Sequence, residues 1–131
     1  SNHELLAEGH FKLNDKDRKN IQRAEQFIKD NLLSEFPGIE EIAKKIGISP
    51  TKLKKDFKCV HNVSIYQYFS SRQMQLAQQL LKSGEKTVRE VATVFGYENM
   101  SKFSAVYKKN FNTLPSLLAS RKSSTHQLKQ L

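Results

Sequence analysis

Residues 39–58 read IEEIAKKIGISPTKLKKDFK, and residues 88–108 read VREVATVFGYENMSKFSAVYK, which is an altered copy of the same pattern. In each copy, apolar residues recur three and four positions apart, as they do on one face of a helix. A glycine follows, and then two apolar residues four positions apart. Phe57 follows Gly47 by 10 positions and Tyr107 follows Gly96 by 11, so the second copy has one extra residue in its turn. Each copy is thus predicted to be a helix, a glycine turn and a second helix, which is the helix-turn-helix pattern.

Helix boundaries follow from local signals on both sides of these copies. Ser49 and Pro50 predict a helix start, because serine can cap free amides and proline costs nothing at the first helical position. Thr87 and Glu90 have the spacing of a capping box. We therefore predict an all-α fold of about seven helices: Asp17 to Leu33, Ile39 to Ile46, Pro50 to about Cys59, Ser64 to Ser83, Val88 to Phe95, Asn99 to about Phe111, and Pro115 to Arg121.

The predicted organisation is two helix-turn-helix subdomains, a homeodomain-like pair, joined by a long connector helix. The expected divisions are 1–16 as a linker or remnant, 17–63 as the first subdomain, 64–83 as the connector, 84–121 as the second subdomain, and 122–131 as a flexible tail. The small residues Ala43 and Ala92 fall where the two helices of each unit would cross. A pair of helical hairpins that merely stack is an alternative, although two copies are fewer than a solenoid normally needs.

Composition favours an acidic partner. The 131 residues include 22 Lys and Arg against 13 Asp and Glu, a formal charge of +9. Such a charge favours nucleic acid ahead of a membrane surface, although it also serves solubility alone. The single Cys59 excludes an intrachain disulfide and a thiolate metal cluster. No apolar run approaches the roughly 20 residues of a membrane helix, so we expect a cytoplasmic, nucleoid-associated protein.

The second helix of the first copy has a basic outward face. The residues predicted to point away from the core are Thr51, Lys52, Lys54, Lys55 and Lys58, with Asp56 as the only acid. Lysines can reach phosphates or donate to guanine, and a threonine methyl can contact a thymine methyl. This face is a candidate DNA-binding surface. The alternative is an ordinary solvated lysine face.

The corresponding helix of the second copy is nearly neutral outside. Its candidate DNA-binding residues are Asn99, Met100, Ser101, Ser104 and Lys108. Asparagine can pair with adenine and serine with several base edges, but no arginine is present to bind guanine bidentately. We expect either weaker, shape-dependent readout here or contacts mainly to the DNA backbone.

The length of the connector is compatible with DNA spacing. About 20 helical residues extend about 30 Å, close to the roughly 34 Å of one duplex turn. One chain is therefore expected to read two major-groove segments about 10 base pairs apart.

Across roughly Lys16 to Arg121, the chain resembles the C-terminal DNA-binding domain of the AraC/XylS family of bacterial transcription regulators. The resemblance is carried by the A-x-x-L-L ending at Ala77 to Leu81, the V-x-E-V-A stretch at Val88 to Ala92, and Gly96-Tyr97. It implies seven helices, two recognition helices in adjacent major grooves, an activator that contacts RNA polymerase, and an upstream sensor or dimerisation domain in the full-length protein. The base-contacting positions that it implies are Thr51, Lys52, Lys54, Lys55, Met100, Ser101, Ser104 and Ala105.

Four positions depart from the family pattern. Ala105 stands where arginine is common, and Gln73 stands where a basic residue is common in the connector. Asn112 replaces a glycine, and asparagine tolerates the left-handed backbone. Leu114 replaces a serine or threonine and cannot cap the last helix.

Two other functions are alternatives to DNA binding. For an enzyme, the histidines His3, His10, His61 and His126 are scattered without metal-ligand spacing, and no phosphate-binding glycine loop is present, so we expect no catalysis, cofactor or metal. The other rival is a helical interaction module that contacts RNA polymerase or another regulator without reading DNA. The lysine-rich helix argues against that module.

Overall fold

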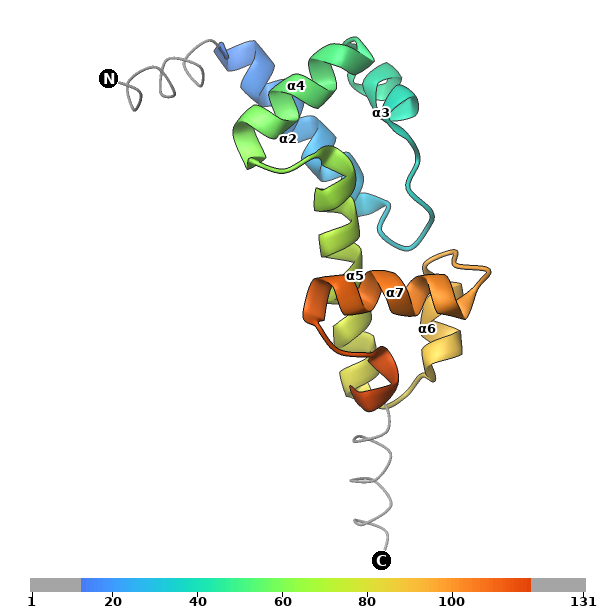
Figure 1. The fold of residues 1–131 in the computed structure, drawn as a ribbon. Helices are drawn as coiled ribbons and strands as arrows, with labels where there is room; N and C mark the ends of the chain where they lie inside the picture. The colour runs from blue at the N-terminus through green and yellow to red at the C-terminus, as the bar shows by residue number, and fades with distance from the viewer. Residues whose placement is uncertain (1–12, 119–131) are drawn as a thin grey trace, which may run out of the picture. The chain divides into compact units, whose positions relative to one another are not determined.

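The computed structural model describes residues 13–118, which form helices joined by short loops (Figure 1). No strand occurs in that range, which confirms the all-α prediction. None of the helices within it is both long and apolar enough to cross a membrane. Residues 115–118 are also helical. The helices, labelled as in Figure 1, are α2 (Asp15–Asp30), α3 (Ile39–Ile46), α4 (Pro50–His61), α5 (Ile65–Ser83), α6 (Val88–Val94) and α7 (Met100–Phe111).

The described chain forms two compact units. Unit 1 extends through Asn31 and resumes from Phe36 to Phe69. It contains α2, α3, α4 and the start of α5. Unit 2 contains Leu32–Glu35 and the chain from Ser70 onward. The helix α5 therefore contributes residues to both units, as expected of a connector helix.

Each unit has its own apolar core. In unit 1, side chains from α2, α3, α4 and α5 are buried together: Ile21, Ala24, Ile28, Ile42, Ala43, Ile46, Leu53, Phe57, Ile65, Tyr68 and Phe69. In unit 2, the buried cluster comes from α5, α6, the turn that follows α6, and α7: Met74, Ala77, Leu81, Val91, Ala92, Phe95, Phe103 and Tyr107. Ala43 and Ala92, the two alanines predicted at the helix crossings, are both buried. A small side chain at such a crossing lets the two helix backbones approach each other.

The predicted capping signals at the helix starts are confirmed. Ser49 Oγ accepts from Lys52 N at 3.1 Å at the start of α4. Thr87 and Glu90 form the reciprocal capping box at the start of α6. At the C-terminus of α7, Asn112 adopts the left-handed conformation with φ 59, as the sequence predicts for the residue that replaces glycine there.

The boundaries of the first predicted helix are wrong. Instead of running from Asp17 to Leu33, α2 begins at Asp15 and ends at Asp30. The Asn31 amide donates to the Phe27 carbonyl oxygen at 2.8 Å and caps the helix end, so the chain leaves the helix earlier than its apolar pattern indicates. Leu33 is 60% exposed.

Two other helix ends differ from the prediction, and a third lies outside the described residues. The helix α6 ends at Val94, one residue before the predicted end at Phe95. The helix α4 continues to His61, two residues beyond the predicted end at Cys59. Of the predicted last helix, residues 115–118 are helical, and the remainder lies outside the described residues.

Candidate nucleic-acid interface

The helix α4 is anchored on one side and exposed on the other. Leu53 and Phe57, four positions apart, are completely buried in unit 1. Because the helix turns once every 3.6 residues, Lys54 and Lys55, which lie between them, face outward. The exposed candidates on that side are Thr51, Lys54, Lys55 and Lys58. Three ammonium groups on one exposed helical face form a surface suited to phosphates and to guanine edges.

Lys52 differs from the other candidate lysines. Its ammonium nitrogen lies 2.9 Å from Asp56 Oδ2 and 3.1 Å from Asp17 Oδ1. The pKa of Lys52 lies above its ordinary value because of the hydrogen bond to Asp56 and then the one to Asp17. A phosphate that bound Lys52 would compete with both carboxylates.

Asp56 does not point outward as predicted. Its residue exposure is only 4%, and its carboxylate lies inside unit 1 beside Lys52. A sequence pattern assigns a charged residue to solvent by default, but burial of a carboxylate is tolerable when a cation pairs with it. The basic face of α4 is therefore free of the acid that the sequence placed on it.

The turn before α4 is held from both of its ends. Gly47 ends α3 in the left-handed conformation with φ 89. The Arg23 guanidinium, from α2, donates to the Ile46 carbonyl oxygen at 3.2 Å and so caps the end of α3. These contacts, together with the Ser49 cap, fix where α4 starts and which face it presents.

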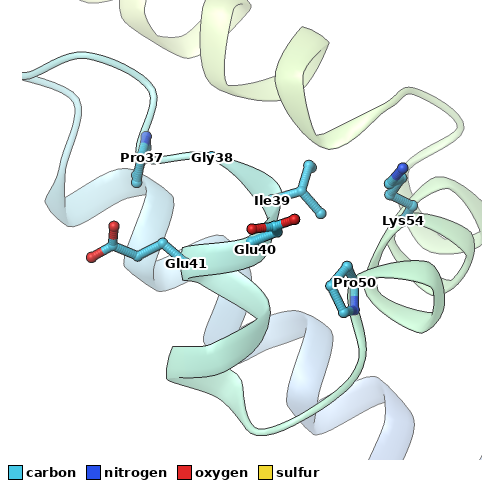
Figure 2. Close-up of a pocket in the computed structure, with 7 residues that line it drawn as sticks. All are labelled: Pro37, Gly38, Ile39, Glu40, Glu41, Pro50 and Lys54. Carbon is cyan, nitrogen blue, oxygen red and sulfur yellow. The ribbon is translucent and has the colours of Figure 1, made fainter.

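A surface hollow beside α4 affects the role of Lys54. It is lined by Lys54 and Pro50 from α4 and by the segment that begins α3, with Glu40 and Glu41 among its lining residues (Figure 2). Figure 2 shows the Glu41 carboxylate turned away from Lys54, so a phosphate that approached Lys54 from this side would meet chiefly the Glu40 carboxylate. The cationic centre of the face is accordingly Lys55 and Lys58.

The helix α7 is built in the same way in unit 2. Phe103 and Tyr107 are buried at 0% and 1% exposure. The candidates Met100, Ser101 and Lys108 are exposed, and Ser104 is half-buried. Asn99 is exposed, but its side-chain oxygen accepts from Ser101 N at 2.8 Å and Lys102 N at 3.3 Å as the N-cap. Only its NH₂ group is left for an adenine, where it could donate to N7. The N6 amino group of that adenine would need an acceptor other than Asn99.

Superposing the buried pairs of α4 and α7 in register shows where the two faces differ. Leu53 and Phe57 correspond to Phe103 and Tyr107. Lys55 and Ala105 are therefore equivalent positions, each at the centre of the outward face of its own helix. The centre of the first face carries a charge, and the centre of the second carries a methyl group.

Two exposed lysines of α7 were missed from the sequence. Lys102 and Lys109 lie on the outward side of α7, next to Ala105. The signal was present, because residues one before Phe103 and two after Tyr107 fall away from the buried stripe. The outward side of α7 is therefore more basic than the nearly neutral face that was predicted.

Comparisons with known proteins match this arrangement. The family model described as "Helix-turn-helix domain" matches residues 42–121. The virulence regulon transcriptional activator VirF of Yersinia enterocolitica is 27% identical over 95 residues, which cover 72% of this chain and 35% of VirF. This chain thus spans about a third of that relative. The regulatory protein SoxS of Salmonella typhimurium is 31% identical over 78 residues, which cover 60% of this chain and 73% of SoxS.

Solved structures share the fold. The C-terminal domain of AraT, a response regulator from Geobacillus stearothermophilus, has a TM-score of 0.74 at 25% identity, covering 83% of this chain and 87% of that chain. An AraC-type transcriptional regulator from Chromobacterium violaceum has a TM-score of 0.72 at 22% identity, covering 83% and 96%. The predicted pair of helix-turn-helix subdomains is confirmed by these neighbours.

Proposed function

The chain belongs to the AraC-type helix-turn-helix family of sequence-specific DNA-binding transcription regulators, and we propose that it reads two successive major-groove segments with α4 and α7. The observation that carries the proposal is the face of α4. Leu53 and Phe57 fix one side of this helix in the core of unit 1, while Thr51, Lys55 and Lys58 stand exposed on the other side. A short, anchored helix with an exposed basic face is what docking into a major groove requires.

In this proposal the two helices play unequal roles. Lys55 and Lys58 of α4 bind phosphates or guanine edges, Lys54 binds at the margin of the face, and Thr51 contacts a thymine methyl. In α7, Ser101 and Ser104 read base edges, Met100 makes apolar contacts, and Lys102, Lys108 and Lys109 bind the DNA backbone. Because Ala105 leaves the centre of α7 without a donor, the second segment is read more by DNA shape than by base contacts.

The length of α5 supports a spacing of one DNA turn. Its 19 residues correspond to about 28 Å at about 1.5 Å per residue. One turn of duplex is about 34 Å, and a modest bend in the DNA accommodates the difference.

Further properties of the full-length protein are part of the same proposal. VirF is named as a transcriptional activator, and we propose that this chain likewise acts with RNA polymerase on bacterial chromosomal DNA in the cytoplasm. Since the chain spans 35% of VirF, we propose that a sensor or dimerisation domain lies upstream. All of these roles are binding roles, and we assign the chain no catalytic step.

Selection from random duplex DNA tests the proposal. We expect enrichment of a motif with two half-sites about 10 base pairs apart. The variant Lys54→Ala/Lys55→Ala, with its helix content unchanged, should lose the selection of the first half-site. Absence of any enriched motif with the wild-type chain would contradict DNA reading and favour a module that contacts only polymerase or another regulator.

A further inference from the structure

A four-residue segment leaves unit 1 and joins unit 2. The chain runs from α2 to α3, both in unit 1, but Leu32–Glu35 between them clusters with the residues from Ser70 onward. We call Leu32–Glu35 the strap. It precedes both recognition helices in the chain, and nothing in its sequence marks it as part of unit 2.

A buried glutamine holds the strap. Gln73 of α5 is only 2% exposed. Its side-chain nitrogen donates to the carbonyl oxygen of Leu32 at 2.9 Å and to that of Ser34 at 3.0 Å. Since an NH₂ group has two donors, both are used on the strap backbone. A buried amide with both hydrogens so engaged fixes the strap against α5.

The strap in turn lies against the turn between α6 and α7. A Cβ atom added at Gly96 would lie 2.8 Å from Glu35 Cγ and 3.3 Å from Glu35 N. At the equivalent Gly47 of unit 1, an added Cβ would meet nothing within 4 Å. Both glycines have positive φ, 80 and 89, so the close approach is the difference between them. Among the described residues, a backbone segment from outside the repeat thus packs on the Gly96 turn, and none comes within 4 Å of a Cβ added at Gly47.

We propose that Gln73 is a positioning residue for α7: it fixes the strap, and the strap fixes the Gly96 turn from which the second recognition helix departs. In unit 1 the equivalent support comes from Arg23, which donates to the Ile46 carbonyl oxygen beside Gly47. The two helix-turn-helix copies thus use unrelated residues outside the repeat to set their recognition helices. This inference rests on the proposed DNA reading by α7.

The test compares Gln73→Met with Gln75→Met. Methionine keeps the length of the side chain and removes both donors, and Gln75 is an exposed glutamine on the same helix. Each protein is titrated with the selected duplex, with a duplex whose first half-site is scrambled, and with one whose second half-site is scrambled. A scrambled half-site that is read should weaken binding roughly tenfold or more.

We expect Gln73→Met to lose discrimination at the second half-site alone. Its affinities for the intact duplex and for the duplex with a scrambled second half-site should converge to within about threefold, while scrambling the first half-site weakens binding as in wild type. Gln75→Met should behave as wild type at both half-sites. Because Gln73 belongs to unit 2, unfolding of that unit would also affect the second half-site alone, so the titrations are done at a temperature at which thermal melting shows both variants folded.

Retained discrimination at the second half-site by folded Gln73→Met would overturn the inference. A wild-type chain that distinguishes neither scrambled duplex would instead contradict the proposed function. If Gln73→Met does not fold, the variant Gly96→Ala tests the inference instead. It displaces the strap from the side of the turn and leaves Gln73 intact. Gly47→Ala is the matched control, because Gly47 also has a positive φ. Loss of second-site discrimination in Gly96→Ala but not in Gly47→Ala supports the inference, and equal discrimination in both overturns it.

Discussion

The ammonium group of Lys52 lies 2.9 Å from the buried carboxylate of Asp56, one turn further along α4. Lys55, three residues after Lys52, is exposed at the centre of the outward face of α4. Under the proposed function, these two lysines of α4 have different roles: Lys52 pairs with a carboxylate of the protein, and Lys55 contacts DNA.

Replacing each of these lysines by methionine should separate the roles. In Lys52→Met the Asp56 carboxylate stays buried without its cation, so we expect a lower melting temperature, because an unpaired buried charge is strongly destabilising. Lys55→Met should melt as wild type and bind DNA more weakly. Thermal melting and duplex titration on both variants check this, and equal melting temperatures would contradict the role of the Lys52–Asp56 pair.

The salt dependence of DNA binding should change in opposite directions at equivalent positions of the two helices. Removing one phosphate contact with Lys55→Ala should reduce the slope of log Kd against log salt by about 0.9. Ala105→Lys, which copies Lys55 into α7, should increase that slope by about 0.9. Titrations at several salt concentrations measure both slopes. An unchanged slope in Ala105→Lys would show that the outward face of α7 does not approach the DNA backbone.

Truncating the central aromatic side chain of either unit should cost much stability. Phe57→Ala in unit 1 and Tyr107→Ala in unit 2 each remove a buried ring, and such changes cost about 3 to 5 kcal/mol. Urea unfolding followed by circular dichroism measures the free energies of unfolding. Tyr66→Ala, at a residue that is 51% exposed, is the control and should cost much less. Comparable losses in all three variants would argue against the cores described for the two units.

Glu25 should make the stability of unit 1 depend on acid pH. Its carboxylate accepts the Tyr68 hydroxyl at 2.7 Å, lies 3.1 Å from Lys29 Nζ, and lies 3.5 Å from His61 Nε2. The Tyr68 hydrogen bond, with smaller contributions from Lys29 and His61, holds the pKa of Glu25 below its ordinary value of 4.5. The folded state thus gains stability above pH 4.5, and this gain is lost as the pH falls below 4.5 through the lowered pKa.

The variant Glu25→Gln tests this dependence. It removes the titrating group, so its free energy of unfolding should fall less steeply than that of wild type below pH 4.5. Glu41→Gln, at an exposed carboxylate of α3, is the matched control. If Glu25→Gln follows the wild-type curve across the acid range, these contacts do not govern the acid stability of unit 1.

The start of the helical segment 115–118 should be improvable. The equivalent position before α5 is Ser64, which accepts from Gln67 N at 3.1 Å while its own N–H donates to Gln67 Oε1 at 3.1 Å. Leu114 has no capping group and is 43% exposed. Leu114→Ser should therefore raise the free energy of unfolding by about 1 kcal/mol, and Ser64→Ala should lower it by about 1 kcal/mol. Denaturant unfolding measures both, and a loss of stability in Leu114→Ser would show that the apolar contacts of Leu114 outweigh a cap.

Much of the fold could be predicted because its signals are local. The 3.6-residue period of apolar positions predicts which faces are buried, and capping residues such as Ser49, Thr87 and Asn99 determine where helices begin. The repeated glycine turn predicted two helix-turn-helix units and hence the helices that carry the candidate site. These features depend on residues within a few positions of one another.

Contacts between distant residues could not be predicted in this way. The sequence placed Asp56 in solvent, continued the first helix to Leu33, and gave no indication that Gln73 holds the Leu32–Glu35 strap on which Gly96 packs. Helical periodicity determined which side chains turn inward, because backbone geometry repeats locally. Only the tertiary structure decided which partners those side chains meet. A hydrogen bond between residues about 40 positions apart, such as that of Gln73 with Leu32, produces no repeating pattern in the sequence.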